Sequence, residues 1–257
     1  MKTFFSLFLT FLFFTSALIA QSSSKPLKPK INSMQKTTTR PKDKRMGLGS
    51  RDMTEKIENN EVAEAFVELK SGNVEQATKQ FEKYSQQDLD AAFGYGLALH
   101  QQGYTKEAIK VLEEVILKDP DHTDAMYELA SIYFESDNYP KAEEYYLNIL
   151  RLDPEDDFTW EDLGFLYTMV EGLESQAIYC FKQVIKLDPE YPDPHFEIAR
   201  IYALTGHDQD AIKQLQLACK KKFEDMNSIS EDEDFKSIHE LPEFNSLMEK
   251  CSTDEMK

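Results

Sequence analysis

Residues Thr123 to Asp156 read TDAMYELASIYFESDNYPKAEEYYLNILRLDPED, and this stretch predicts two amphipathic helices followed by a stop. Apolar residues recur at helical spacing in each half, which gives each helix one apolar face. Asp137-Asn138 interrupts the pattern, and Asn tolerates the left-handed backbone that helix ends often need. Pro140 suits the first turn of the second helix, whereas Pro154 cannot continue a helix and therefore ends it. Two helices this short cannot bury both apolar faces alone, so copies on either side are expected.

Copies of this pattern recur along the chain at steps of 31 to 35 residues. An alanine of the second helix recurs at Ala77, Ala108, Ala142, Ala177 and Ala211. A small residue of the first helix recurs at Ala65, Gly96, Ala130, Gly164 and Ala199. Asp-Pro stops recur at Pro120, Pro154 and Pro189. A small residue in each helix allows the two backbones to approach closely, so the period has a steric reason.

The fourth copy is the most complete, with Trp160, Leu163, Gly164 and Tyr167 at repeat spacing. With these residues the chain resembles the tetratricopeptide repeat family, whose pattern extends over about 34 residues. The resemblance covers residues 58–223 and implies an all-α fold, a right-handed α-solenoid of about five helix-turn-helix repeats with a C-terminal helical cap. It places the repeats at 58–88, 89–122, 123–156, 157–191 and 192–223. An unrelated helical bundle is the alternative.

The segments that flank the repeats differ from them in composition. Residues 1–20 hold a short apolar run that ends in small residues, which predicts a signal peptide cleaved near Ala20. Residues 21–52 are rich in Ser, Thr, Lys and Pro and predict a disordered basic arm that precedes the solenoid at 53–223. Residues 224–250 are expected to cover the last repeat, with a helix starting at Ser230, and residues 251–257 to form a disordered tail.

Two locations follow from the N-terminal segment. A cleaved signal peptide predicts an exported protein, in a periplasm or outside the cell. An uncleaved anchor is the alternative, because residues 21–51 carry nine basic residues and one acidic residue. That asymmetry would hold the repeats on the cytoplasmic side of a membrane and attach the chain through its N-terminus.

Charge separates the arm from the rest of the chain. The whole chain has a formal net charge of −18, whereas residues 52–257 contain 19 basic and 46 acidic residues. An acidic body repels phosphates, so nucleic acid is not an expected partner. The arm lacks an aromatic residue that could stack on a base. It is expected to be a solvated linker, with docking onto its own acidic repeats as the alternative.

Catalytic and metal-binding patterns are absent from the sequence. The five histidines are scattered, and the three cysteines form no CxxC pair, so no metal or cofactor is expected. No phosphate loop, nucleophile elbow or dinucleotide fingerprint occurs. Cys180 and Cys219 fall in second helices, where a small apolar packing role is expected. Because three is an odd number, an exported chain must leave at least one thiol free or pair it between chains.

The family resemblance implies a partner-binding groove lined by the first helices of the repeats. Carried over to this chain, the groove residues are Phe66, Asp90, Phe93, Leu97, Tyr127, Phe134, Phe158, Glu161, Phe165, Phe196 and Arg200. They form an aromatic floor with acidic residues along it, and aromatic rings supply contact area at low entropic cost. The alternative, that some of these rings belong to the core, stays open.

The resemblance also indicates which partner suits the groove. Family members that bind acidic chaperone tails hold the terminal carboxylate with basic side chains. Here the corresponding positions include Phe93 and Leu97, so an apolar segment with flanking Lys or Arg is expected instead. The predicted function is a non-enzymatic adaptor for a protein partner. The alternative is a structural subunit of a membrane-associated complex, and the sequence leaves the oligomeric state open.

Overall fold

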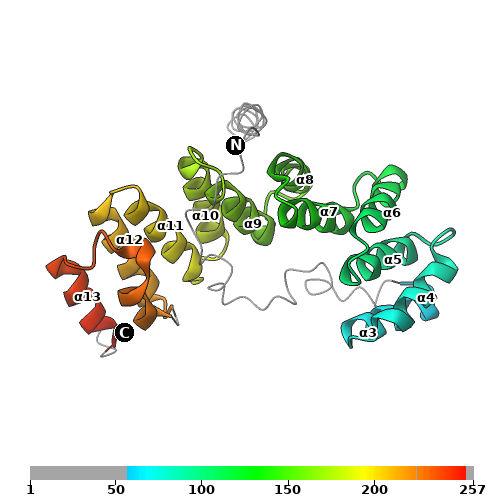
Figure 1. Ribbon diagram of the computed structural model, residues 1–257, viewed down its shortest axis with the longest axis horizontal. Helices are drawn as coiled ribbons and strands as arrows, with labels where there is room; N and C mark the ends of the chain where they lie inside the picture. The colour runs from blue at the N-terminus through cyan, green and yellow to red at the C-terminus, as the bar shows by residue number, and fades with distance from the viewer. Residues whose placement is uncertain (1–56, 224, 253–257) are drawn as a thin grey trace. The chain divides into compact units, whose positions relative to one another are not determined.

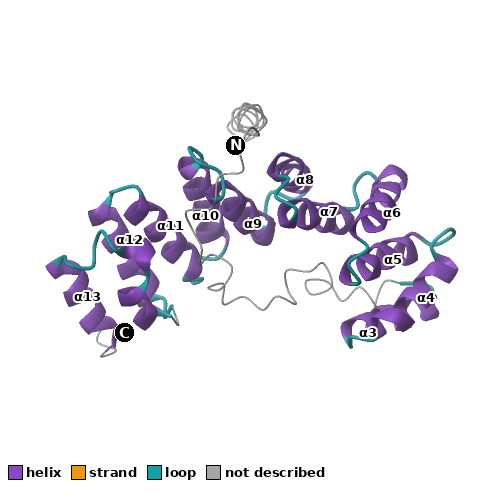
Figure 2. Ribbon diagram, viewed as in Figure 1, coloured by secondary structure: helices purple, strands orange, loops and turns teal. Residues whose placement is uncertain are grey.

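The computed structural model of the chain describes residues 57–223 and 225–252, and their regular structure is helical (Figures 1 and 2). The predicted signal peptide, the basic arm and residues 253–257 lie outside the described residues. The chain divides into two compact units, the first ending at Pro154 and the second continuing from Glu155. Each unit is built from antiparallel helix pairs.

The first unit contains three helix pairs, one for each of the first three predicted repeats (Figure 1). The pairs are α3 (Asn60–Lys70) with α4 (Val74–Tyr84), α5 (Leu89–Gln101) with α6 (Thr105–Lys118), and α7 (Thr123–Glu135) with α8 (Tyr139–Leu152). Successive first helices also contact one another, α3 against α5 and α5 against α7.

The second unit contains two helix pairs and a C-terminal segment. The pairs are α9 (Asp157–Thr168) with α10 (Glu174–Leu187), and α11 (Asp193–Leu204) with α12 (Asp208–Lys220). The C-terminal segment comprises the short 3-10 helices η2 (Met226–Glu231) and η3 (Glu233–Phe235), followed by α13 (Pro242–Ser252). Because α13 extends through Ser252, the first two residues of the expected disordered tail are helical.

The ends of the helices follow from identifiable residues. Asp88 and Asp156 each accept a hydrogen bond from a backbone N–H in the first turn of α5 and α9, at 3.1 Å. Such side-chain caps satisfy donors that the helix itself cannot pair. At the opposite end of α8, Asp153 has an extended backbone, with φ −129° and ψ 92°, because Pro154 follows it. The Asp-Pro stops predicted from the sequence therefore end α6, α8 and α10, the second helices of three pairs.

The turn inside each helix pair contains one residue with a left-handed backbone. In four pairs this residue is a glycine, and in the third it is Asp137, with φ 57°. The sequence analysis had expected Asn138 to take this conformation, but Asn138 has φ −87° and precedes α8. The left-handed residue therefore lies one position earlier than expected. Asp137 is at the repeat position that glycine occupies in the other pairs, at Gly72, Gly103, Gly172 and Gly206.

Small residues allow the close packing within each pair. The five recurring alanines of the second helices are fully buried. In the second pair, a Cβ added to Gly96 would lie 2.7 Å from Leu112 Cδ2 of the facing helix. In the fourth pair, a Cβ added to Gly164 would lie 3.0 Å from Phe181 Cε1. The steric interpretation of the repeat spacing therefore holds at these positions.

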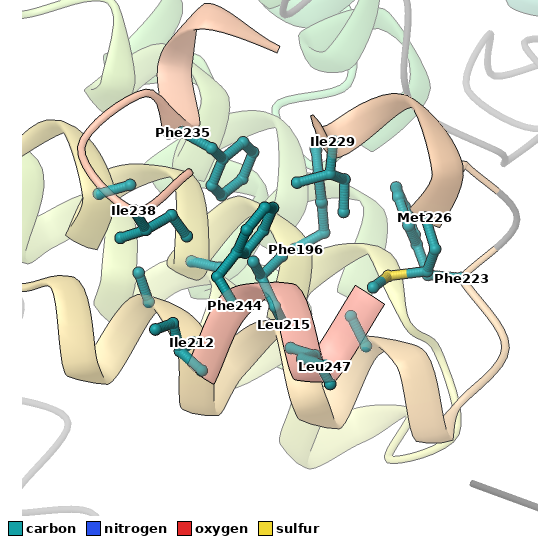
Figure 3. Close-up of a cluster of buried hydrophobic side chains, with 14 residues drawn as sticks. Phe196, Ile212, Leu215, Phe223, Met226, Ile229, Phe235, Ile238, Phe244 and Leu247 are labelled. Carbon is teal, nitrogen blue, oxygen red and sulfur yellow. The ribbon is translucent and has the colours of Figure 1, made fainter. Parts of the chain in front are cut away.

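The C-terminal segment covers the last helix pair, as the sequence predicted. Figure 3 shows Phe235, Ile238, Phe244 and Leu247 among the side chains of α11 and α12, and Phe196 lies at the centre of the cluster. Fully burying one such side chain contributes about 1.5–3 kcal/mol. The expected helix start at Ser230 is wrong, because Ser230 lies inside η2 and Asp232 caps η3.

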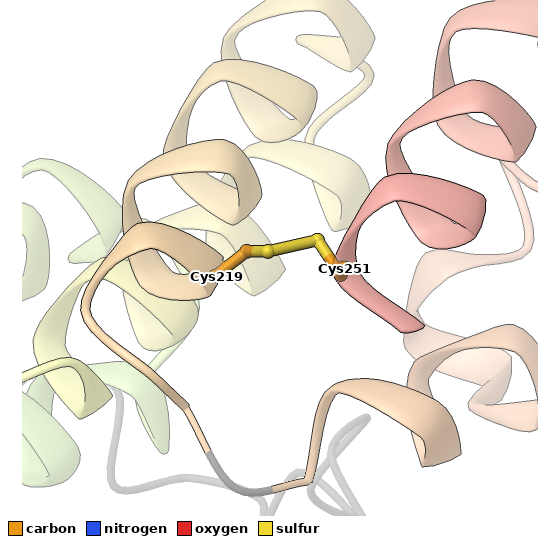
Figure 4. Close-up of a disulfide and its surroundings, with 2 residues drawn as sticks. All are labelled: Cys219 and Cys251. Carbon is orange, nitrogen blue, oxygen red and sulfur yellow. A yellow bond between two sulfur atoms is a disulfide. The ribbon is translucent and has the colours of Figure 1, made fainter. Parts of the chain in front are cut away.

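A disulfide joins the C-terminal segment to the last repeat. Cys219 of α12 is bonded to Cys251 of α13, 32 residues further along the chain (Figure 4). The expectation that Cys219 has a small packing role is therefore wrong, whereas Cys180 of α10 is fully buried. No helix among the described residues has the length and apolarity that crossing a membrane requires.

Candidate functional site

The candidate site is built from the first helix of each pair, since the predicted groove residues lie there. The structure separates them by burial. Half-buried are Asp90, Tyr127, Phe134 and Phe158. Buried are Phe66, Phe93, Leu97, Glu161, Phe165, Phe196 and Arg200. The two sets have different surroundings.

In the first unit, two of the predicted groove rings are core residues. Phe66 and Phe93 are fully buried, and their ring centroids lie 6.3 Å apart between α3 and α5. The Phe66 ring also meets Phe81 of α4 at 4.7 Å in an edge-on arrangement. These rings pack the pairs together. They belong to the core, which is the alternative that the sequence left open.

The surface that remains on α5 and α7 is acidic and aromatic. We call it the α5–α7 face and define it as Asp90, His100, Asp124, Tyr127, Glu128, Phe134 and Glu135. Its two aromatic rings, Tyr127 and Phe134, pack against α8. Tyr127 meets Tyr146 at 6.0 Å and Phe134 meets Tyr139 at 5.8 Å, so both rings are fixed while one side stays partly exposed.

The carboxylates at one end of the α5–α7 face repel one another. Burial raises the pKa of Asp90, and the nearby Asp88 and Asp124 raise it further, whereas His122 lowers it. Asp90 and Asp124 occupy the same place in successive repeats, so the packing of α5 against α7 brings them close together. A positive charge arriving here would relieve this repulsion.

At the other end of the face, one histidine bridges two repeats. His100 of α5 lies with Nδ1 2.6 Å from Glu128 Oε1 and Nε2 3.3 Å from Glu135 Oε2, both on α7. The hydrogen bond to Glu128 is the main cause of a raised His100 pKa, and the charges of Glu128 and Glu135 add to it against the effect of burial. The bridge is therefore strongest when the imidazole is protonated.

In the second unit, the predicted groove residue Arg200 is fully buried among acidic side chains. Its guanidinium lies 3.0 Å from Glu197 of the same helix, 3.4 Å from Asp234 and 3.9 Å from Asp232. It also lies 4.6 Å from the centre of the Phe196 ring. A helix starting at Ser230, as the sequence predicted, would have placed Asp232 and Asp234 in its first turn; both side chains instead contact this buried arginine.

Burial of Glu197 and the carboxylates near it raise its pKa. Desolvation raises the pKa of Glu197 to about 7, against the lowering effect of Arg200, with Asp193, Asp234 and Asp232 raising it further. Close by in the chain, the Tyr191 hydroxyl lies 2.8 Å from Glu161 Oε1 and 3.1 Å from Asp193 Oδ2. The predicted groove residue Glu161 is thus held by a tyrosine that the sequence analysis did not select.

Three residues that matter here were missed from the sequence. Glu128 and Glu197 occupy the same place, the sixth of the repeats that begin at residues 123 and 192, next to the strongly apolar positions Leu129 and Ile198. A charged residue beside a core position was the available signal, and the three-residue spacing from Glu197 to Arg200 was a second one. Tyr191 had no comparable signal. Among the described residues, no group of three or more His, Cys, Asp and Glu is arranged to hold a metal ion.

Comparisons with known proteins identify the repeats. Two family models described as tetratricopeptide repeat match residues 62–115 and 99–163. The general transcriptional corepressor ssn6 of Schizosaccharomyces pombe is 30% identical over 128 residues, which are 48% of this chain and 11% of that protein. Superkiller complex protein 3 of Homo sapiens is 36% identical over 73 residues, 28% of this chain and 5% of that protein. The chain therefore matches only a small part of each of these relatives.

Solved structures support the same fold. MamA from Desulfovibrio magneticus RS-1 aligns with a TM-score of 0.57 at 17% identity, covering 65% of this chain and 97% of that one. At this identity the likeness concerns the fold. The all-α helix-pair architecture predicted from the sequence is confirmed.

Proposed function

Because residues 62–163 match family models of the tetratricopeptide repeat, we propose that the chain is a non-enzymatic adaptor that binds a protein partner on its α5–α7 face. The observation that carries this proposal is the pairing of held, half-buried rings with acidic side chains on two neighbouring first helices. Rings already fixed by packing lose little conformational freedom when a partner covers them.

The charges of the face indicate the partner's chemistry. As defined, the face contains four carboxylates and one histidine, and Asp90 is already unfavourably placed near Asp88 and Asp124. A basic side chain would be attracted here, whereas an acidic one would be repelled. Tyr127 and Phe134 provide apolar area beside these carboxylates. The expected partner is therefore an apolar segment flanked by Lys or Arg.

An arrayed peptide library tests this preference with the full chain as the probe. We expect selection of peptides with an apolar centre and flanking Lys or Arg. The variant D90K/D124K should lose these peptides, because it replaces attraction by repulsion at the half-buried end of the face. Binding that weakens about tenfold or more would correspond to the loss of at least one close charge contact.

A matched variant separates this effect from a change in overall charge. E107K/E114K alters the chain's net charge by the same amount, but at two exposed positions of the second helix α6. It should keep the selected peptides. Selection of acidic peptides by the wild-type chain, or equal binding by D90K/D124K, would contradict the proposal.

We also propose that the chain works in an oxidising space outside the cytosol. The Cys219–Cys251 disulfide supports this, because such bonds persist mainly in exported proteins. The apolar run before Ala20 supports it independently. The intact mass of the chain from its own host tests the proposal. A soluble species without its first residues and with one disulfide is expected; a full-length, reduced species in membranes would favour the anchored alternative.

A further inference from the structure

The C-terminal segment contacts two of the residues assigned to partner binding. Asp232 and Asp234 face the Arg200 guanidinium, and the Phe235 ring lies 5.4 Å from the Phe196 ring. Figure 3 shows Phe235 directed toward the cluster that contains Phe196. An acidic-aromatic stretch of this chain thus fills the surface of α11 where the family resemblance places a partner.

Further contacts fix the position of this stretch on α11. Ser237 Oγ donates to the Ala203 carbonyl at 3.2 Å and lies 2.8 Å from Asp208 Oδ1 at the start of α12. The backbone N–H of Ile238 donates to the Phe235 carbonyl at 2.9 Å, which closes the turn after η3. The stretch is therefore held in one register, as a bound peptide would be.

The segment is fastened to the last repeat at a separate point. Figure 4 shows the disulfide between Cys219, near the end of α12, and Cys251, near the end of α13. It closes a loop that contains Asp232, Asp234 and Phe235. Closing a loop of this length limits how far the stretch can move away from α11.

We propose that residues Asp232–Phe235 are an intramolecular ligand of the Phe196–Arg200 site, and that the Cys219–Cys251 disulfide controls its displacement. The site then accepts a partner segment of the same chemistry, in which spaced aspartates precede an aromatic residue. This site differs from the α5–α7 face in its charge preference and lies in the other unit. Failure of one proposal therefore leaves the other unaffected.

The redox step has a simple balance. A dithiol reductant gives up two electrons and two protons, the bond between the Cys219 and Cys251 sulfurs breaks, and both become thiols. The reductant is left as a disulfide. The stretch then remains attached to α11 only by its non-covalent contacts, so a competing segment displaces it more readily.

Hydrogen exchange of the full chain tests the control by the disulfide. In the oxidised chain, the amides of residues 226–238 should be protected. Reduction should raise their exchange rates by about 30- to 1,000-fold, which corresponds to the loss of a typical disulfide's contribution to stability. Helix α10 of the same unit should change little. C219S/C251S should exchange like the reduced chain and should not respond to the reductant.

Peptide binding in trans tests the ligand chemistry. The probe is the peptide SEDEDFKSIHE, residues 230–240, and its control replaces Asp232 and Asp234 by Asn and Phe235 by Ala. The receptor is the full reduced chain carrying the same three substitutions, so that its own stretch competes poorly. We expect at least about tenfold tighter binding of the native peptide than of the control, because the control lacks the charged and aromatic contacts.

Each result decides the proposal. Unchanged exchange of residues 226–238 upon reduction would exclude control by the disulfide. Equal binding of the two peptides would exclude the Phe196–Arg200 site as their receptor. If circular dichroism shows that the triple variant has lost helix, D232N/D234N replaces it as receptor, since it keeps the Phe235 ring in the core. Peptide binding to that receptor should still require the peptide's aspartates.

Discussion

Glu128 in the first unit and Glu197 in the second occupy the same place in their repeats, yet they are neutralised in different ways. Both are nearly buried, with 7% and 2% of their surface exposed. Glu128 is paired with His100, which belongs to the preceding repeat. Glu197 is paired with Arg200 on its own helix, and Arg200 also contacts the C-terminal segment.

The difference shows that one repeat position can serve two kinds of junction. His100 joins repeat to repeat, and its charge depends on pH near neutrality. Arg200 joins the last repeat to the segment that covers it, and its charge is permanent. The cation of the inner junction can thus lose its charge as pH rises, whereas the cation of the end junction keeps it.

The largest expected effect is at Arg200. Replacement by methionine keeps much of the side-chain volume but removes the cation that faces the buried Glu197 and the half-buried Asp234. Breaking a buried pair in this way costs about 3–5 kcal/mol of unfolding free energy. Urea unfolding followed by the fluorescence of Trp160, the only tryptophan of the chain, measures the stability of the second unit.

An exposed ion pair of the same unit provides the control. Lys213 and Asp210 also pair at a three-residue spacing, at 2.9 Å, but both side chains are largely exposed. K213M should therefore change the unfolding free energy far less than R200M does. If R200M and K213M had similar small effects, the buried junction would be no different from a surface pair.

The second prediction concerns the titration of Glu197. Its pKa of about 7 in the folded chain lies above the ordinary value of 4.5. Between these two values the unfolded chain has lost the proton while the folded chain keeps it. Stability should therefore fall by about 3 kcal/mol as pH rises from about 4.5 to about 7, and then level off. Trp160 fluorescence over a pH series of urea titrations measures this slope.

Comparison with the variant E197Q separates the titration of the Glu197 carboxyl from that of nearby groups. The buried His195 has a lowered pKa, mainly through desolvation, so it contributes a slope of the opposite sign over the acidic range. Because His195 is present in both proteins, the difference between wild type and E197Q belongs to Glu197. A pH dependence that is the same in both proteins would show that Glu197 titrates normally.

The parts of the fold that depend on local spacing were predictable. Pro154 forces Asp153 into an extended backbone, and a Cβ added to Gly164 would make an unusually tight contact with the Phe181 ring. Such constraints act within a few residues or within one helix pair. They therefore recur with the repeat and are visible in the sequence.

The candidate site was less predictable, because it depends on contacts without a period. Phe93 and Tyr127 share the fifth place of their first helices, yet Phe93 is core and Tyr127 is half-buried. The spacing fixes the side of the helix but not how deeply each ring inserts. Arg200 and Cys219 both meet residues of the C-terminal segment, which lies outside the repeat pattern. No spacing rule could pair them with Asp234 and Cys251.

The smallest predicted effect is at the repeat junction between α5 and α7, and it should be present at low pH and absent at high pH. The pKa of His100 is raised by Glu128, so its stabilising contribution is complete below the ordinary value of 6.5. It is lost as pH rises through the higher folded value. H100Q, which can still bond to Glu128 but cannot gain a charge, should therefore be less stable than wild type by about 1–2 kcal/mol at pH 6 and similar to it at pH 9.

Hydrogen exchange in α5 and α7 measures this difference locally, and a variant at Glu135 provides the control. The Glu135 side chain is 65% exposed and its contact with His100 Nε2 is longer, at 3.3 Å. E135Q should therefore change protection by less than about 0.5 kcal/mol at either pH. If E135Q removed the pH dependence and H100Q did not, the junction would depend on surface charge. If H100Q alone removes the pH dependence, the pair of His100 with the buried Glu128 is what makes this junction respond to protons.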